Sequence, residues 1–167
     1  MPNNETSTVS DNLAVRYGLR FGYAAGLAGL AAGVFTALAL TPGGQGMQFC
    51  LPGCLLFLIA LYLFGEVGHW TARRVGTISS GTLAAALSGM FSGLGLTIGF
   101  YGARLMAHQL PTTKLTGADL VFVLAVGIAI GTIVDVGLFV GIGAGVGAFG
   151  ASIGREQYRK QAQQGPA

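Results

Sequence analysis

Charged residues are scarce in this sequence. Asp, Glu, Lys and Arg make up 9% of its 167 residues, whereas hydrophobic residues make up 52%. Soluble domains usually carry about 25% charged residues, and a large buried core does not explain so wide a deficit. The apolar residues must therefore face lipid, and the length leaves room for one bundle of spans without a separate soluble domain. We expect an all-α membrane protein.

Residues that carry catalysis or bind metals are also few. Cys50 and Cys54 resemble neither a disulfide framework nor a zinc site, which needs more ligands. The serines have no His and Asp arranged near them in a recognisable order. The glycine-rich segment 141–154 lacks the Gly-Lys-Ser/Thr ending of a phosphate loop. We expect no catalytic activity, no metal and no cofactor, and we leave open a redox role for the two cysteines.

Four apolar runs are long enough to cross a bilayer as helices. Polar or helix-breaking segments at 41–44, 77–80 and 111–114 separate them. We expect residues 1–12 to form a disordered polar tail and residues 155–167 to form a polar cytoplasmic tail. The predicted bundle covers residues 13–154, with spans at 21–40, 49–68, 81–102 and 119–145 and a glycine-rich end that continues the fourth span.

The last apolar run, residues 119–154, is longer than one crossing needs. It forms either one tilted or kinked span, or two short spans that meet near Asp135 and give five crossings. No turn signal interrupts residues 132–134, and a fifth crossing would place the positive C-terminal tail outside the cell. Both observations favour four spans.

Positive charges gather on one side of the predicted bundle. With the N-terminus inside, seven Lys and Arg residues flank the spans on the cytoplasmic side and two on the outer side. Cytoplasmic loops of membrane proteins carry such an excess, so we predict that both termini are cytoplasmic. Because the positive residues lie at the ends of apolar runs, we expect no nucleic-acid partner. The cytoplasmic residues are Arg16, Arg20, Arg73, Arg74, Arg155, Arg159 and Lys160, and the outer ones are Arg104 and Lys114.

Glycine is abundant, with 29 of the 167 residues, against roughly 7% of residues in an average protein. Small residues recur every four positions in the first, third and fourth spans, which forms a groove on one helix face. These grooves either pack the helices of one molecule together, or one of them, between Gly137 and Gly147, receives a second copy or another membrane protein. The second span has no such row, and we expect it to be the most lipid-exposed helix. The predicted packing residues are Gly22, Gly26, Gly89, Gly93, Gly137, Gly141 and Gly145.

Ionisable groups inside a span cost at least ~2.5 kcal/mol on insertion scales, so each one needs a physical reason. Asp135 is the clearest case, and counting from the outer ends of the spans places Glu66 at a similar depth. We predict a polar cluster that either forms an ion-pair network or serves as a proton or cation site. The predicted cluster consists of Arg20, Glu66, His69, Arg73 and Asp135.

Residues 65–76, with the sequence GEVGHWTARRVG, are followed by glycines at 81, 89 and 93. This pattern resembles small four-span bacterial membrane proteins of unknown function, in which an Ala-x-Arg-type turn joins the second and third spans. The resemblance implies a four-span bundle in a prokaryotic inner membrane, and it gives no activity or site residues. We expect a structural or accessory subunit that acts through helix association. The alternative is a small proton- or cation-coupled transporter or channel that uses Asp135 and Glu66.

Overall fold

The structure, a computed structural model, describes residues 4–40, 46–106 and 117–163. These residues form four helices and no strand: α1 (Asn4–Ala39), α2 (Gly46–Val75), α3 (Ile78–Met106) and α4 (Ala118–Gln163). Each helix contains a segment that is long and apolar enough to cross a membrane. The all-α class and the four membrane-length helices are therefore confirmed for the described residues.

The helices extend beyond the predicted spans. Residues 4–12, expected to be disordered, belong to α1, and residues 155–163 continue α4 as a helix. Once a helix exists, each added residue gains one hydrogen bond, so a long span continues into flanking residues that contain no breaker. Residues 1–3 and 164–167 of the two predicted tails lie outside the described residues.

α4 is one continuous helix of 46 residues. At 1.5 Å per residue it is about 69 Å long, more than twice the roughly 30 Å of a hydrocarbon core. Residues 132–134 are helical. The two short spans meeting near Asp135 are therefore not observed.

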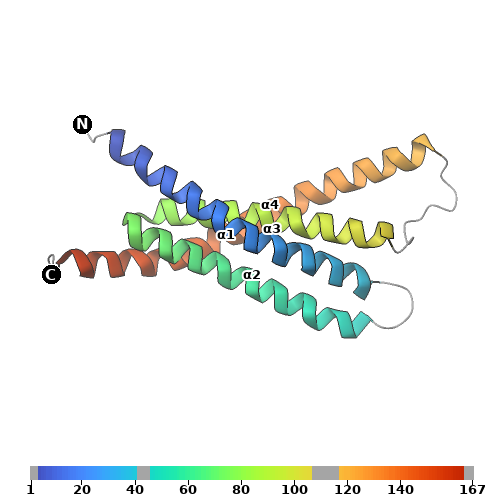
Figure 1. The fold of residues 1–167 in the computed structure, drawn as a ribbon, viewed down its shortest axis with the longest axis horizontal. Coiled ribbons are helices and arrows are strands. Elements are labelled where there is room, and N and C mark those ends of the chain that lie inside the picture. Colours follow the sequence, from blue (N-terminus) through green and yellow to red (C-terminus); the bar gives the residue numbers. More distant parts are fainter. Residues whose placement is uncertain (1–3, 41–45, 107–116, 164–167) are drawn as a thin grey trace.

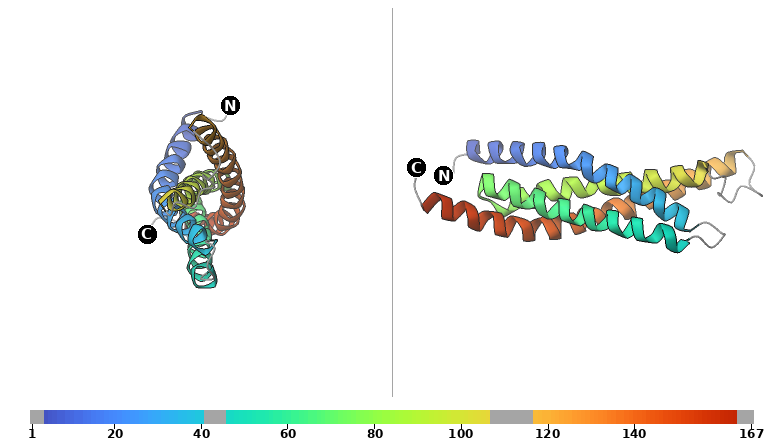
Figure 2. Two further views of the ribbon diagram at one scale, coloured as in Figure 1. Left: turned by 90° about the vertical axis from the view of Figure 1, so that its right-hand side faces the viewer. Right: turned by 60° about the horizontal axis from the view of Figure 1, so that its bottom comes forward.

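Consecutive helices run in opposite directions, and both chain ends lie at the same end of the bundle as the turn between α2 and α3 (Figure 1). α2 and α3 each contact all the other helices, whereas the described parts of α1 and α4 do not contact each other. The apolar window of α3 is the most buried of the four. Viewed along the bundle, α3 lies between α1 and α4 (Figure 2). It is the central helix.

The turn between α2 and α3 depends on a glycine. Gly76 has a φ of 79°, and its N–H donates to the carbonyl of Ala72 at 2.7 Å, as in a left-handed helix C-cap. The hydroxyl of Thr77 lies 2.7 Å from that of Ser80 in the first turn of α3. The ring of Tyr158 occupies the space beside Gly76 that a side chain would need. The C-terminal part of α4 is therefore packed on this turn.

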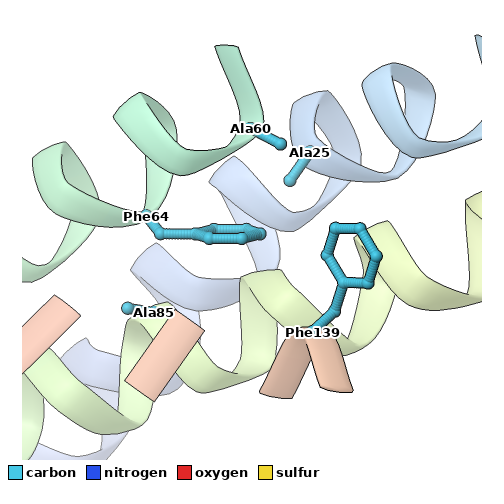
Figure 3. Packing of buried hydrophobic residues seen from close by; sticks show 5 residues of the cluster. All are labelled: Ala25, Ala60, Phe64, Ala85 and Phe139. Carbon is cyan, nitrogen blue, oxygen red and sulfur yellow. The ribbon is translucent and has the colours of Figure 1, made fainter. Parts of the chain in front are cut away.

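Small residues fill most of the interior. Two large side chains join them: the rings of Phe64 and Phe139 lie 6.5 Å apart at 84°, and Ala25, Ala60 and Ala85 belong to the same cluster (Figure 3). Every residue of α3 that is buried is Gly, Ala, Ser or Thr, which lets three helices approach its backbone. The buried residues of α3 are Ser80, Gly81, Ala84, Ala85, Ser88, Gly89, Ser92, Gly93, Gly95, Thr97 and Gly99.

α4, and not α2, is the most exposed helix. In its apolar window 6% of the residues are buried, against 17% in α2 and 44% in α3. The first part of α4 diverges from the other helices (Figure 1). The expectation that the second span is the most lipid-exposed is therefore wrong, because bulky side chains alone do not show how far a helix leaves the bundle.

Candidate functional site

Glycines bring α1 and α3 into backbone contact. A Cβ at Gly95 would overlap the carbonyl oxygen of Gly26, and a Cβ at Gly22 would collide with the ring of Phe91. A Cβ at Gly26 would lie 3.4 Å from the carbonyl oxygen of the same Phe91. The predicted packing role of Gly22 and Gly26 is therefore observed.

Glycines serve the contact between α3 and α4 in the same way. A Cβ at Gly89 would overlap the carbonyl oxygen of Phe139, and one at Gly93 would lie 2.8 Å from the Cα of Val136. Both glycines are buried. They therefore pack helices together as predicted.

A junction of three helices lies nearer the chain ends. A Cβ at Gly68 of α2 would overlap the carbonyl oxygen of Gly147, and one at Gly147 would overlap the side chain of Ala85. A Cβ at Gly81 would lie 2.6 Å from both the Cβ of Ala151 and the carbonyl oxygen of Gly68. Five small residues therefore set the distance between α2, α3 and α4, and Gly68 was not among the predicted packing residues.

Gly137, Gly141 and Gly145 form the open glycine row. A Cβ on any of them would have no atom within 4 Å, so the prediction that they pack the helices of one molecule is wrong. The glycines of this part of α4 that do pack are Gly143 and Gly147. Gly143 is two positions from Gly141 and thus about 200° around the helix. The prediction of a partner on the open glycine row is untouched by this result.

Tyr101 of α3 contacts the first part of α4. The Tyr101 hydroxyl donates to the carbonyl of Gly127 at 3.0 Å. Beside this contact lies an apolar cavity of about 300 Å³ between α3 and α4, with Thr97 and Ile98 on one wall and Ile128 on the other. The divergence of α4 therefore leaves a crevice at the level of these residues.

Asp135 lies on α4 where the two helices part. The hydroxyl of Thr97, which is 2% exposed, donates to Oδ2 of Asp135 at 2.8 Å and also lies 3.2 Å from the carbonyl of Gly93. Among the described residues, no basic side chain lies within 4.0 Å of Asp135. Its carboxyl group is therefore held by a neutral hydroxyl.

Glu66 is held within its own helix. The Tyr62 hydroxyl donates to Oε1 at 3.0 Å, and Nε1 of Trp70 donates to Oε2 at 2.8 Å. Glu66 and His69 line a groove of about 330 Å³ between α2 and α4, whose other wall includes Phe149. Both carboxylate oxygens thus have a donor on a partly exposed surface.

The structure does not bring Asp135 and Glu66 together. Gly65, the neighbour of Glu66, packs against Gly150 of α4, fifteen residues after Asp135. That separation corresponds to about 22 Å along the helix axis. The expectation of equal depth was wrong because α4 begins farther along the bundle axis than α2 does (Figure 1).

The basic members of the predicted cluster lie in other grooves. Arg20 lines a groove between α1 and α2 together with Trp70 and Arg74, and Arg73 lines a shallow groove with Trp70 and Gln161. Among the described residues, the one ion pair joins Lys160 and Glu156 on the surface of α4. The predicted five-residue ion-pair network therefore does not form.

Cys50 and Cys54 are free and exposed near the start of α2. In the described parts of the chain, no group of three or more His, Cys, Asp or Glu residues is placed to hold a metal ion.

The protein is a bundle of four membrane-length helices held together by contacts between small residues. It carries two carboxylates that lie apart from each other and a group of arginines near the chain ends. In comparisons with known proteins, no family model, no curated protein and no solved structure matches the chain.

Proposed function

We propose that this chain is an integral membrane protein that acts as a structural or accessory subunit through helix association. The observation that carries the proposal is the open glycine row, where an added Cβ would meet no atom of another described helix within 4 Å. Glycine in a helix interior costs about 1 kcal/mol relative to alanine. At glycines such as Gly89 and Gly150 close backbone contact offsets that cost, and in the open glycine row contact with a partner helix would offset it.

The partner we propose is a second copy of α4. Three glycines at four-residue spacing make a flat strip on which another helix packs closely, and two identical strips fit each other. Large apolar side chains on the same part of α4 are exposed, including Ile133 at 73% and Leu138 at 57%. They would pack beside the glycine contact.

The membrane placement is supported by the four apolar helices and by the distribution of charge. Seven of the nine Lys and Arg residues belong to the segments at the end of the bundle where α1 begins and α4 ends. By the positive-inside rule we place that end in the cytoplasm. The resemblance of residues 65–76 to four-span bacterial proteins supports a prokaryotic inner membrane.

Two substitutions on neighbouring positions test the proposal. Gly141→Leu adds a side chain on the open glycine row, and Gly143→Leu adds the same side chain where a Cβ would lie 2.7 Å from the carbonyl oxygen of Ala85. We expect Gly141→Leu to leave the melting temperature in detergent unchanged and to abolish the dimer. Gly143→Leu should instead lower the melting temperature.

Cross-linking identifies the partner. In a Cys50→Ser, Cys54→Ser background, Gly141→Cys should form a disulfide-linked dimer in the membrane on oxidation. Gly102→Cys is the control, because Gly102 is an equally open glycine outside the row. A wild type that is monomeric in bilayers, or a Gly141→Leu variant with unaltered assembly, would refute the proposal.

A proton-coupled transporter or channel is the second candidate, and the geometry of Asp135 favours it specifically. The Thr97 hydroxyl has one proton and two acceptors, Asp135 and the carbonyl of Gly93. A protonated Asp135 would donate to Thr97, whose own proton would then serve Gly93. Two proton arrangements therefore fit the same atoms, as an exchange site requires.

Flux measurements separate the two candidates. If the second one is right, liposomes that contain the wild type should pass protons, and Asp135→Asn should abolish the flux. Glu66→Gln is the matched control, because Glu66 lies about 22 Å away along the helix axis. Equal flux in the wild type, the Asp135→Asn variant and empty liposomes would exclude the transporter.

A further inference from the structure

The groove between α1 and α2 near the chain ends combines charge with an apolar wall. It measures about 520 Å³. Two arginines, Arg20 of α1 and Arg74 of α2, reach it from opposite sides, and the remaining lining is aromatic or aliphatic: Tyr17, Phe21, Ala24 and Trp70. We propose that this groove binds the phosphate headgroup of an anionic phospholipid, with an acyl chain along α1. The proposal rests on the membrane placement proposed above.

The arginines in this groove have no ion-pair partner among the side chains that the structure describes. Among the described residues no carboxylate lies within 4.0 Å of Arg20 or Arg74. Arg73 adds a third positive charge in an adjoining groove that Trp70 and Arg74 also line. Three like charges close together at a membrane surface attract an anion, and basic pockets between membrane helices bind anionic lipid headgroups.

The orientation of Arg74 suits a phosphate. Its guanidinium carbon lies over the Tyr17 ring, 5.5 Å from the ring centroid, which is within cation–π range. The N–H groups point outward in the plane of the guanidinium, and two of them can bind two phosphate oxygens. Because the guanidinium is planar and rigid, an arginine also loses less conformational freedom for each hydrogen bond that it forms with a ligand.

The apolar wall favours a lipid over a soluble phosphate. Phe21 and Ala24 continue the groove from Arg20 toward the middle of α1, and exposed Leu27, at 69%, follows one turn later. An acyl chain that covers such a surface gains binding free energy from the buried apolar area, whereas inorganic phosphate buries no apolar area there. Trp70 is fixed by its hydrogen bond to Glu66, and tryptophan favours the headgroup level of a bilayer.

Trp70 provides the measurement, because it is the single tryptophan of the chain and lines the groove. The protein is reconstituted in phosphatidylcholine vesicles, and part of the lipid is replaced by phosphatidylglycerol or phosphatidylcholine with brominated acyl chains, which quench nearby indoles. We expect brominated phosphatidylglycerol to quench Trp70 at a lower mole fraction than brominated phosphatidylcholine does. This selectivity for phosphatidylglycerol should be about fivefold for each arginine that binds the phosphate.

Variants assign the selectivity to the groove. Arg20→Gln and Arg74→Gln should each lower it about fivefold, and the double variant should have equal affinity for both lipids. Arg159→Gln, which removes the same charge from the exposed end of α4, should keep the wild-type selectivity. Arg20 and Arg74 are exposed, so both single variants should fold, and the melting temperature checks this.

Three results would overturn the lipid site: a wild type without selectivity, an equal loss in Arg159→Gln, or loss of selectivity on adding inorganic phosphate but not chloride at equal ionic strength. The first two leave no specific site, and the third identifies a site for free phosphate. Flotation of the protein with vesicles after a carbonate wash is scored separately. A protein that fails to float contradicts the membrane placement, whereas one that floats without lipid selectivity contradicts the groove alone.

Discussion

The two halves of α4 both carry glycines four residues apart, but these glycines have different surroundings. In the half nearer the C-terminus, Cβ atoms at Gly150 and Gly154 would overlap carbonyl oxygens of α2. In the half nearer the N-terminus, Gly127 and Gly131 contact the bundle through Tyr101. Both pairs have the same four-residue spacing. The spacing of glycines therefore shows that another helix can approach this one closely. The position of the neighbouring helices decides whether such a contact forms.

The glycines of α4 also fall into two groups, those that contact neighbouring helices and those that face open space. Gly143 and Gly147 lie against neighbouring helices, whereas Gly141 and Gly145, which alternate with them in sequence, face open space. A helix has room for both because successive residues are about 100° apart. One element can thus hold its own bundle together and still present a surface to a partner.

The largest effect is expected from Gly150→Leu in the packed half of α4. A side chain there has no space beside the carbonyl of Gly65, so α2 and α4 must separate. We expect a loss of roughly 3 kcal/mol or more in unfolding free energy. Unfolding in mixed detergent measures it, with Gly145→Leu as control at an open position. Equal stability of the two variants would remove the distinction between the two faces.

A smaller effect is expected where the two halves meet. Thr97→Val keeps the shape of the side chain and removes the donor to Asp135. A polar group deprived of its partner costs about 1–3 kcal/mol, and the coupling between two membrane residues averages about 0.6 kcal/mol. A double-mutant cycle with Asp135→Asn measures that coupling. A coupling of zero would mean that Thr97 does not hold Asp135.

The smallest effect is expected in the diverging half. Tyr101→Phe removes its hydrogen bond to Gly127, worth about 1 kcal/mol. We expect faster amide hydrogen exchange in residues 121–131 and an unchanged rate in residues 143–154. If exchange accelerates equally in both segments, the two halves are not independent.

Much of the fold was predictable from the sequence. The scarcity of charge and the four apolar runs predicted membrane-length helices. Four of the seven proposed packing glycines, Gly22, Gly26, Gly89 and Gly93, lie in helix contacts, and at all of these except Gly26 a Cβ would collide with the neighbouring helix. Less of the site was predictable. Gly68 was not predicted as a packing residue because α2 has no row of small residues at four-residue spacing. The nearby Gly65, together with Gly150 and Gly154, could have indicated a close contact between α2 and α4.

The sequence by itself determined that this chain forms long apolar helices and that small residues would let them pack closely, because both properties are local to each residue and its neighbours along the helix. Only the tertiary structure decided which glycines are covered, how far α4 diverges and where Glu66 and Asp135 lie relative to each other. These depend on the rotation, tilt and shift of one helix against another. Side chains distant in sequence set those three quantities together.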